Sequence, residues 1–223
     1  MTRSQIRDRI LAALNESTSA PVHWSTAQLD AVIAEAAEVL AEEAKAIRRT
    51  AFVGRQAGAI YYFTRTVASD VMAITRVWLP DMSKRLTAVS LAELDTQNVA
   101  WSSATGDPEY WFPVSWDCFG VYPHPATSGG LFRVDYLAWP RTLQDDDDEP
   151  EFREADHDSL VMYGVYDGLM KKWDVGRALE LYQRFIGQWE TGRARNGVRE
   201  SQTRTYQRTT APGHPFPSGV ARG

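Results

Sequence analysis

The residues best suited to chemistry are four histidines and a dense set of carboxylates. Asp156-His157-Asp158 places a carboxylate on each side of an imidazole, and such a neighbour can fix the tautomer of a catalytic or metal-bound histidine. The other histidines, His23, His124 and His214, lie far apart in the chain, and no H-x-H or H-E-x-x-H spacing occurs. His157 also begins an apolar run with helical spacing, so Asp156 or Asp158 is predicted to be the N-cap of a helix.

The remaining candidate motifs do not form a recognisable site. Asp145 to Asp148 could attract calcium, but an EF-hand alternates its ligands and needs Gly at position six and Glu at position twelve. Neither G-x-G-x-x-G nor the P-loop pattern occurs. Cys118, the single cysteine, lies in an apolar run typical of a core strand, and His124 between two prolines is predicted to lie in a loop. The sequence therefore predicts no catalytic residue, no metal site and no cofactor.

Charge is distributed unevenly along the 223 residues. Residues 144 to 158 hold nine acids and one arginine, whereas residues 193 to 223 hold six arginines and one glutamate. The rest of the chain is nearly neutral, although the net charge is −5. We therefore expect a neutral body with an acidic loop, mobile or awaiting a partner, and a basic tail that is disordered until something binds it.

Composition narrows the protein class further. No apolar run approaches the roughly 18 residues of a membrane span, and no signal peptide pattern is present, so we expect a cytosolic or assembly-bound protein. Twenty of the 24 basic residues are arginine, and the eight Trp, eight Phe and nine Tyr exceed what the core needs. Arginine and aromatic residues are enriched at protein interfaces, which favours subunit contacts.

Hydrophobic spacing predicts helices at both ends of the chain. Residues 2 to 14 have one apolar side, and Ser25 to Gln28 forms a capping box before a helix predicted over 26 to 49. After the acidic loop, residues 159 to 190 are predicted to form two antiparallel helices separated near Asp174. A second capping box at Ser90 to Glu93 predicts one or two further helical turns before Trp101.

The middle of the chain is typical of short strands. Five or six mainly antiparallel strands are predicted from the following aromatic and β-branched runs, which Gly and Pro turns separate: Ile60–Thr66, Val71–Leu79, Arg85–Val89, Tyr110–Val114, Cys118–Tyr122 and Leu131–Trp139.

The fold class that follows is α+β, a helical bundle of N- and C-terminal helices with an inserted antiparallel β domain and an extended or disordered basic tail. The predicted division of the chain is into helices at 1–56, an inserted β domain at 57–143, an acidic loop at 144–158, helices at 159–192 and a basic tail at 193–223.

The order of several short motifs resembles the head-to-tail adaptor (connector) proteins of tailed bacteriophages. The similarity covers about residues 20 to 190. Its pieces are the long helix after Trp24-Ser25, Lys84–Leu86 before Ser90–Leu94, Gly106–Tyr110, Val121–Pro125, Leu131–Tyr136, Trp139–Leu143 and the helix that begins with Asp156–Val161. The Asp145 to Asp148 block departs from the family, whose members often have a shorter turn there.

The resemblance implies a structural virion protein at the head-tail interface, or neck. Such adaptors form a ring of twelve subunits under the portal, which extends the channel for double-stranded DNA and docks the tail or a second neck protein. The partners implied are the portal, the tail and other copies of the chain, with no membrane and no sequence-specific DNA contact. Our candidate contacts with the portal or with a neighbouring protein lie in the basic tail, at Arg193, Arg195, Arg199, Arg204, Tyr206 and Arg208. Asp145, Asp146, Asp147 and Asp148 are the candidate contacts with neighbouring subunits or the tail.

Two other interpretations stay open from the sequence. The first is a β-rich binding module of a phage tail or receptor-recognition protein, with exposed Trp and Tyr on a β face. The second is an enzyme, such as a hydrolase that uses Asp156, His157 and Asp158.

Overall fold

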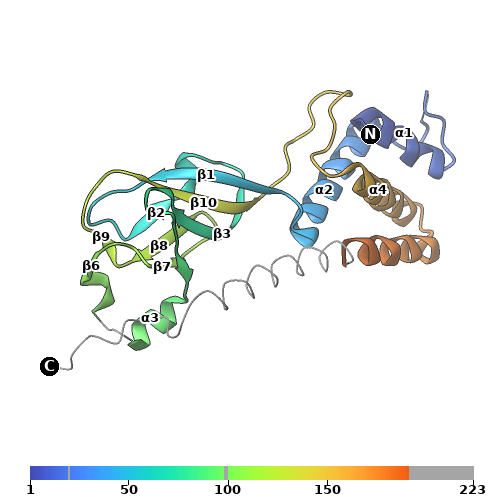
Figure 1. Ribbon diagram of the computed structural model, residues 1–223. Helices are drawn as coiled ribbons and strands as arrows, with labels where there is room; N and C mark the ends of the chain where they lie inside the picture. Colours follow the sequence, from blue (N-terminus) through green and yellow to red (C-terminus); the bar gives the residue numbers. More distant parts are fainter. Residues whose placement is uncertain (20, 98–99, 191–223) are drawn as a thin grey trace. The chain divides into compact units, whose positions relative to one another are not determined.

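The computed structural model describes residues 1–19, 21–97 and 100–190 and has the predicted α+β class (Figure 1). Its contacts divide these residues into two compact units. The helical unit comprises 1–49 and 137–190, and the sheet unit comprises 50–136. Two strands, β1 (Arg48–Gly54) and β10 (Leu131–Ala138), carry the chain from one unit into the other.

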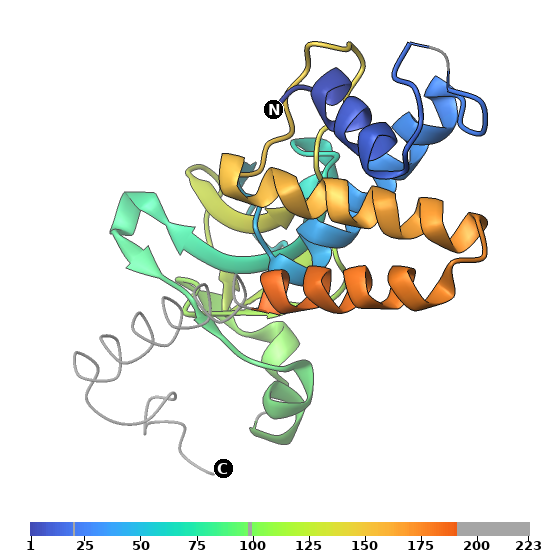
Figure 2. The ribbon, with the colours of Figure 1, turned by 90° about the vertical axis from the view of Figure 1, so that its right-hand side faces the viewer.

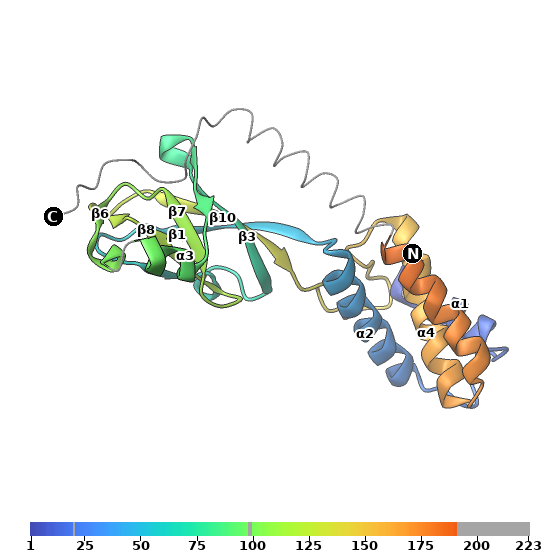
Figure 3. The same cartoon turned by 90° about the horizontal axis from the view of Figure 1, so that it is seen from below.

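The helical unit is built from α1 (Arg3–Ala13), α2 (Thr26–Ala44), α4 (His157–Lys171) and a further helix that includes residues 175–190. α1, α2 and α4 contact one another (Figure 3). Each of the first two helices begins with a capping box, Thr2 with Gln5 and Ser25 with Gln28, which satisfies backbone N–H groups in the first turn. Their apolar faces are buried as the spacing predicted.

Glycine allows α1 and α4 to approach closely. A Cβ atom at Gly164 would collide with the side chain of Ile10, and one at Gly168 would collide with that of Leu14. The two glycines are four residues apart and so lie on the same face of α4. The side chains of α1 fill the space over that face.

The helix at 175–190 packs antiparallel to α4 (Figure 2). Ser159 donates to Gln188 at 2.6 Å, and the rings of Tyr163 and Phe185 lie 5.4 Å apart. Tyr163 also donates to Glu35 of α2 at 2.7 Å, and burial together with this carboxylate raises the pKa of Tyr163. The antiparallel helix pair is therefore confirmed, and its arrangement with α1 and α2 as one bundle stays a prediction.

The helix predicted over residues 26 to 49 is shorter than expected. α2 ends at Ala44, and Lys45 after it takes the left-handed conformation with φ of 49°. β1 then begins at Arg48. Ile47 fits the helical spacing but is not part of the helix. Its carbonyl accepts a hydrogen bond from the N–H of Ala138 in β10. Burial alternates along β1, with Ala51 and Val53 inward and Phe52 exposed, but Ala51–Val53 is a continuous apolar run in the sequence, so this alternation is visible only in the structure.

The sheet unit contains two four-stranded sheets and one two-stranded sheet. Sheet A has the order β1-β10-β3-β4, sheet B the order β2-β8-β7-β5, and sheet C pairs β6 with β9. The strands not yet bounded are β2 (Tyr61–Phe63), β3 (Val71–Leu79), β4 (Lys84–Arg85), β5 (Thr87–Ala88), β6 (Thr105–Gly106), β7 (Tyr110–Pro113), β8 (Cys118–Tyr122) and β9 (His124–Pro125).

Several strand predictions need correction. The run predicted over 85 to 89 breaks at Leu86, since β4 pairs with β3 in sheet A while β5 pairs with β7 in sheet B. The run predicted over 60 to 66 gives a three-residue strand followed by a 3₁₀ turn, η1 (Thr64–Thr66). His124 lies in β9 rather than in a loop, and both the β5–β7 and the β6–β9 pairs are parallel.

The core of the sheet unit lies between sheets A and B. Sheet A contributes Phe132 and Val134 from β10 and Val77 and Leu79 from β3, and sheet B contributes Phe119 among others. A second cluster on the other face of sheet B joins Phe112 to Leu94 of α3 (Leu91–Gln97) and Trp101 of η3 (Trp101–Ser103). Ser90 and Glu93 form the predicted capping box of α3.

Candidate interaction surfaces

The acidic loop, predicted to be mobile or to await a partner, is attached to the first turns of α1. The backbone N–H groups of Arg3 and Ser4 donate to the carbonyls of Asp148 and Asp146 at 2.8 and 3.0 Å. The guanidinium groups of Arg3 and Arg7 reach the Asp146 carboxylate at 3.0 and 2.7 Å. Their side chains are only 14% and 12% exposed. We name these two residues the arginine clamp.

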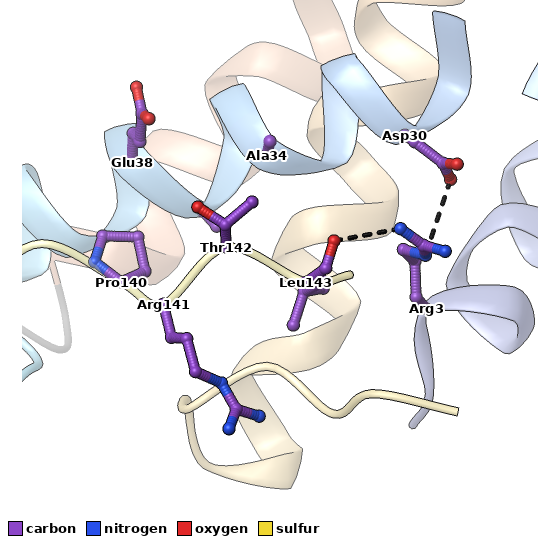
Figure 4. Close-up of a pocket in the computed structure, with 9 residues that line it drawn as sticks. Arg3, Asp30, Ala34, Glu38, Pro140, Arg141, Thr142 and Leu143 are labelled. Atoms are coloured by element: carbon purple, nitrogen blue, oxygen red, sulfur yellow. Dashed lines mark hydrogen bonds and ion pairs between the residues drawn. The ribbon is translucent and has the colours of Figure 1, made fainter. Parts of the chain in front are cut away.

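The clamp also connects the loop to α2. Arg7 donates from two nitrogens to Asp30, at 2.9 and 3.1 Å, while Arg3 donates to the carbonyl of Leu143 at 2.9 Å. Figure 4 shows Arg3 between Asp30 and Leu143 at one end of a cavity of about 40 Å³. Ligand pockets usually hold roughly 300 Å³ or more, so this cavity is too small for a substrate.

Successive acids along the loop have different surroundings, which alternate from one residue to the next. Hydrogen bonds from Arg7 and then Arg3 lower the pKa of Asp146, and the backbone N–H groups of Asp145 and Gln144 lower that of Asp148. By contrast, Asp145, Asp147 and Glu149 are exposed, and no hydrogen bond or ion pair joins their carboxylates to another described residue. The fold therefore uses Asp146 and Asp148 to hold the loop and presents the other three acids to solvent.

The attachment of the loop should depend on pH only in strongly acidic solution. Because the pKa of Asp146 is lowered from its usual 3.8 in the folded state, the charged carboxylate stabilises the attached loop above that value. This contribution is lost as the pH falls through the lowered pKa. We expect the amide NMR shift of Ser4, which bonds to the carbonyl of Asp146, to stay constant from about pH 8 to 5 and to change only below about pH 4. A midpoint near neutral pH would contradict the ion pairs as the cause.

An apolar surface lies at the turn after α4. Trp173 is 89% exposed and takes a left-handed conformation with φ of 61°. Met170, Val175 and Leu179, which are close to it in the chain, are also exposed. We call these four residues the helical tip. A tryptophan with almost no burial contributes little to the fold of a single chain, whereas tryptophans are frequent among residues that dominate binding energy.

A second apolar surface lies at one end of sheet B. Phe63 ends β2 and pairs with Cys118, while Val114 donates its N–H to the carbonyl of Cys118, so β2 and the β7–β8 turn meet there. Trp116 in that turn is 54% exposed, and Val67 is similarly exposed. We call Phe63, Val67, Val114 and Trp116 the sheet tip. Asp117 stabilises the turn, since it is buried, accepts from Ser115 at 2.6 Å and lies 3.6 Å from Arg65.

The acids beside His157 do not form a catalytic group with it. Asp156 pairs with Arg153 and Asp158 with Arg9, at 3.0 and 2.8 Å. His157 is buried, with its Nε2 3.1 Å from the carbonyl of Phe152 and its Nδ1 2.8 Å from the amino group of Met1. Asp156 occupies the N-cap position of α4, as predicted, although its side chain makes no capping hydrogen bond.

The structure also describes the surroundings of Cys118 and of the groups that could bind a metal. Cys118 is buried as predicted, and desolvation raises the pKa of its thiol, which favours the unreactive protonated form. Among the described residues, no group of His, Cys, Asp and Glu is arranged to hold a metal ion. No helix in the described ranges is long and apolar enough to cross a membrane.

The predicted contact residues divide into two sets. Asp145 to Asp148 lie together in the attached loop, and their contacts with neighbouring subunits or with the phage tail stay a prediction. The candidate residues of the basic tail, Arg193, Arg195, Arg199, Arg204, Tyr206 and Arg208, lie outside the described residues. The arginine clamp was not predicted, although Arg3 and Arg7 are spaced by one helical turn. Nothing in the sequence distinguishes the exposed Trp116 and Trp173 from core tryptophans such as Trp111.

The described residues thus expose two apolar tips and an ordered acidic loop, which are surfaces suited to contacts with other proteins. The family described as SU10 adaptor protein matches residues 1–214, and the chain belongs to that family. The match confirms the resemblance to phage head-to-tail adaptors. The protein is accordingly a structural component of a phage virion that interacts with other head or tail proteins. No curated protein matches the chain.

Proposed function

We propose that the protein is a ring-forming adaptor that binds under the portal, extends the DNA channel and docks the tail. The observation that carries this proposal is the match of residues 1–214 to an adaptor family. The structure adds exposed apolar tips in both units, centred on Trp173 in one and Trp116 in the other. Twelve copies, the number that the resemblance implies, would form the ring in the neck of the virion.

Two different contact surfaces are what a closed ring requires. In a ring each subunit presents one face to the preceding copy and another to the following copy, which is a heterologous association. A single self-complementary patch would give a dimer instead. The helical tip and the sheet tip differ in residues and in supporting elements, so they can bind different partners.

The charge of the chain fits a channel that DNA crosses without being held. Each phosphate that a protein neutralises adds to binding, and a strongly basic lumen would retain the DNA. The net charge of the whole chain is −5. This balance supports passage of double-stranded DNA rather than sequence-specific binding.

Electron microscopy of the protein mixed with its purified portal tests the proposal. We expect a ring of density on the tail-facing end of the portal, with the same rotational symmetry in every class average. The portal alone is the control for that density. A protein that stays monomeric beside bare portals would overturn the proposal.

The basic tail is the second part of the proposal, with Arg193 to Arg208 contacting the portal. Six arginines against one glutamate in residues 193–223 provide charge for an acidic surface. Deletion of residues 197–223 should weaken attachment to the portal at least about tenfold while circular dichroism stays nearly unchanged. Attachment measured by mass photometry that equals that of the full chain would show that the tail is not the portal contact.

A further inference from the structure

The outer face of sheet A gathers arginine and tryptophan. Val77 and Leu79 of β3 point into the core, so by strand alternation Arg76 and Trp78 point away from it. Trp78 is paired with Arg85 of β4, and the guanidinium of Arg133 on β10 lies 6.0 Å from the centre of the Trp78 ring. Three neighbouring strands thus place basic side chains around one tryptophan. We call Arg76, Trp78 and Arg133 the arginine face.

The arginine face keeps hydrogen-bonding capacity for a partner. Arg133 uses its Nε to donate to Asp135 at 3.1 Å, and its two terminal nitrogens form no hydrogen bond with a described residue. Its side chain is 46% exposed. Asp135 shares the face but is held by Thr50 at 2.8 Å as well, and Arg76 has no ion pair with a described residue. Basic groups therefore outnumber acids here.

The acidic loop has the complementary chemistry. Asp145, Asp147 and Glu149 are exposed and unpaired within the described residues, while the arginine clamp holds the carboxylate of Asp146, which lies between the first two. A loop ordered in advance loses less conformational entropy on binding than a mobile one. Carboxylates are the groups that a guanidinium fork binds best, and an aromatic ring beneath the arginine orients it.

We infer that the acidic loop of one copy docks on the arginine face of the next copy in the ring. This inference rests on the proposed ring function. The two surfaces belong to different units of the chain and have opposite charge, which is the property that a heterologous contact between identical subunits needs. Asp145, Asp147 and Glu149 pair with Arg76 and Arg133, and Trp78 supports the arginine side chains.

Charge reversal tests the contact. One variant carries Arg76→Glu and Arg133→Glu, and a second carries Asp145→Lys, Asp147→Lys and Glu149→Lys. Each should occupy portals at least about tenfold less well than the wild type in mass photometry, because like charges then face each other between copies. An equimolar mixture of the two should recover assembly, since every contact between unlike copies is again complementary.

The mixture separates a lost contact from a lost fold, because two misfolded variants would not rescue each other. A chain that carries all five reversals should also assemble alone. The matched control, Arg177→Glu with Arg184→Glu, makes the same charge change as the first variant on exposed residues of the helical unit and should assemble normally. Failure of the mixture to recover would overturn the inference while wild-type rings still support the proposed function.

A different occupant would give a different pattern. If the arginine face bound DNA, Arg76→Glu with Arg133→Glu would weaken binding of a fluorescent 30-base-pair duplex and leave ring assembly intact. That outcome would overturn the contact between copies. The proposed function would fail separately, through the absence of wild-type rings on the portal.

Discussion

Replacement of Gly120 by valine is expected to destabilise the sheet unit by about 3 kcal/mol, because overpacking a filled site forces neighbouring groups to move. Gly120 lies in β8 opposite Phe112 of β7 and Tyr61 of β2. The Phe112 ring occupies the position that a side chain at residue 120 would need. Phe112 is fully buried and packs edge-on against Trp101, with 5.3 Å between ring centres, so it has little room to yield. Urea unfolding followed by tryptophan fluorescence measures the loss.

Gly54→Val is the matched control for this prediction. Gly54 also lies in a strand, but no atom lies within 4 Å of the position where its Cβ would be, so the change should alter the free energy of unfolding by no more than about 0.5 kcal/mol. Equal losses for Gly120→Val and Gly54→Val would mean that the backbone freedom of glycine, rather than the Phe112 ring, sets the cost.

The elements that sequence reasoning found are those with local signals. Ser25 and Ser90 begin helices where their capping boxes predicted, because each bond joins residues only three positions apart. β3 and β8 have the predicted bounds, Val71–Leu79 and Cys118–Tyr122, since each is an apolar or β-branched run between turn residues. Such signals depend on neighbours in sequence and survive folding.

The features that it missed depend on contacts distant in sequence. Nothing near Leu86 indicates that β4 and β5 join different sheets, since their partners β3 and β7 lie on either side of them in the chain. From the sequence alone, Gly120 is only a residue with low strand propensity. Its close approach to the ring of Phe112 is visible only in the structure. The same limit applies to β1, whose seven residues follow directly on the helical pattern of α2.

The acidic loop shows the same difference between local signals and contacts that are distant in sequence. Charge counting identified Asp145 to Asp148 as a distinct segment, but it treated the four acids as equivalent. Only the contact with Arg3 and Arg7, some 140 residues away in the chain, distinguishes Asp146, which holds the loop, from Asp147, which faces solvent. A run of like charge is costly to order alone, and the arginine clamp supplies the compensating charge.

Removal of the arginine clamp should release the acidic loop and leave the helices folded. In Arg3→Ala with Arg7→Ala, Asp146 loses both guanidinium partners and Leu143 loses its side-chain donor. α1 should stay in place, because Ile6, Ile10 and Leu11 are buried. The Ser4 amide, which bonds to the Asp146 carbonyl, should exchange with solvent at least about tenfold faster in hydrogen-exchange NMR, whereas the Leu14 amide inside the unit should not change.

Arg9→Ala is the control for the clamp, since Arg9 lies on the same helix, is exposed and pairs with Asp158 rather than with the loop. It should leave the Ser4 amide protected, because surface ion pairs of this kind contribute little. Persistent protection of Ser4 in the double variant would show that the backbone bonds of the loop suffice without the arginines. Because the clamp variant keeps Asp145, Asp147 and Glu149, weaker ring assembly in it would show that the order of the loop matters in addition to its charge.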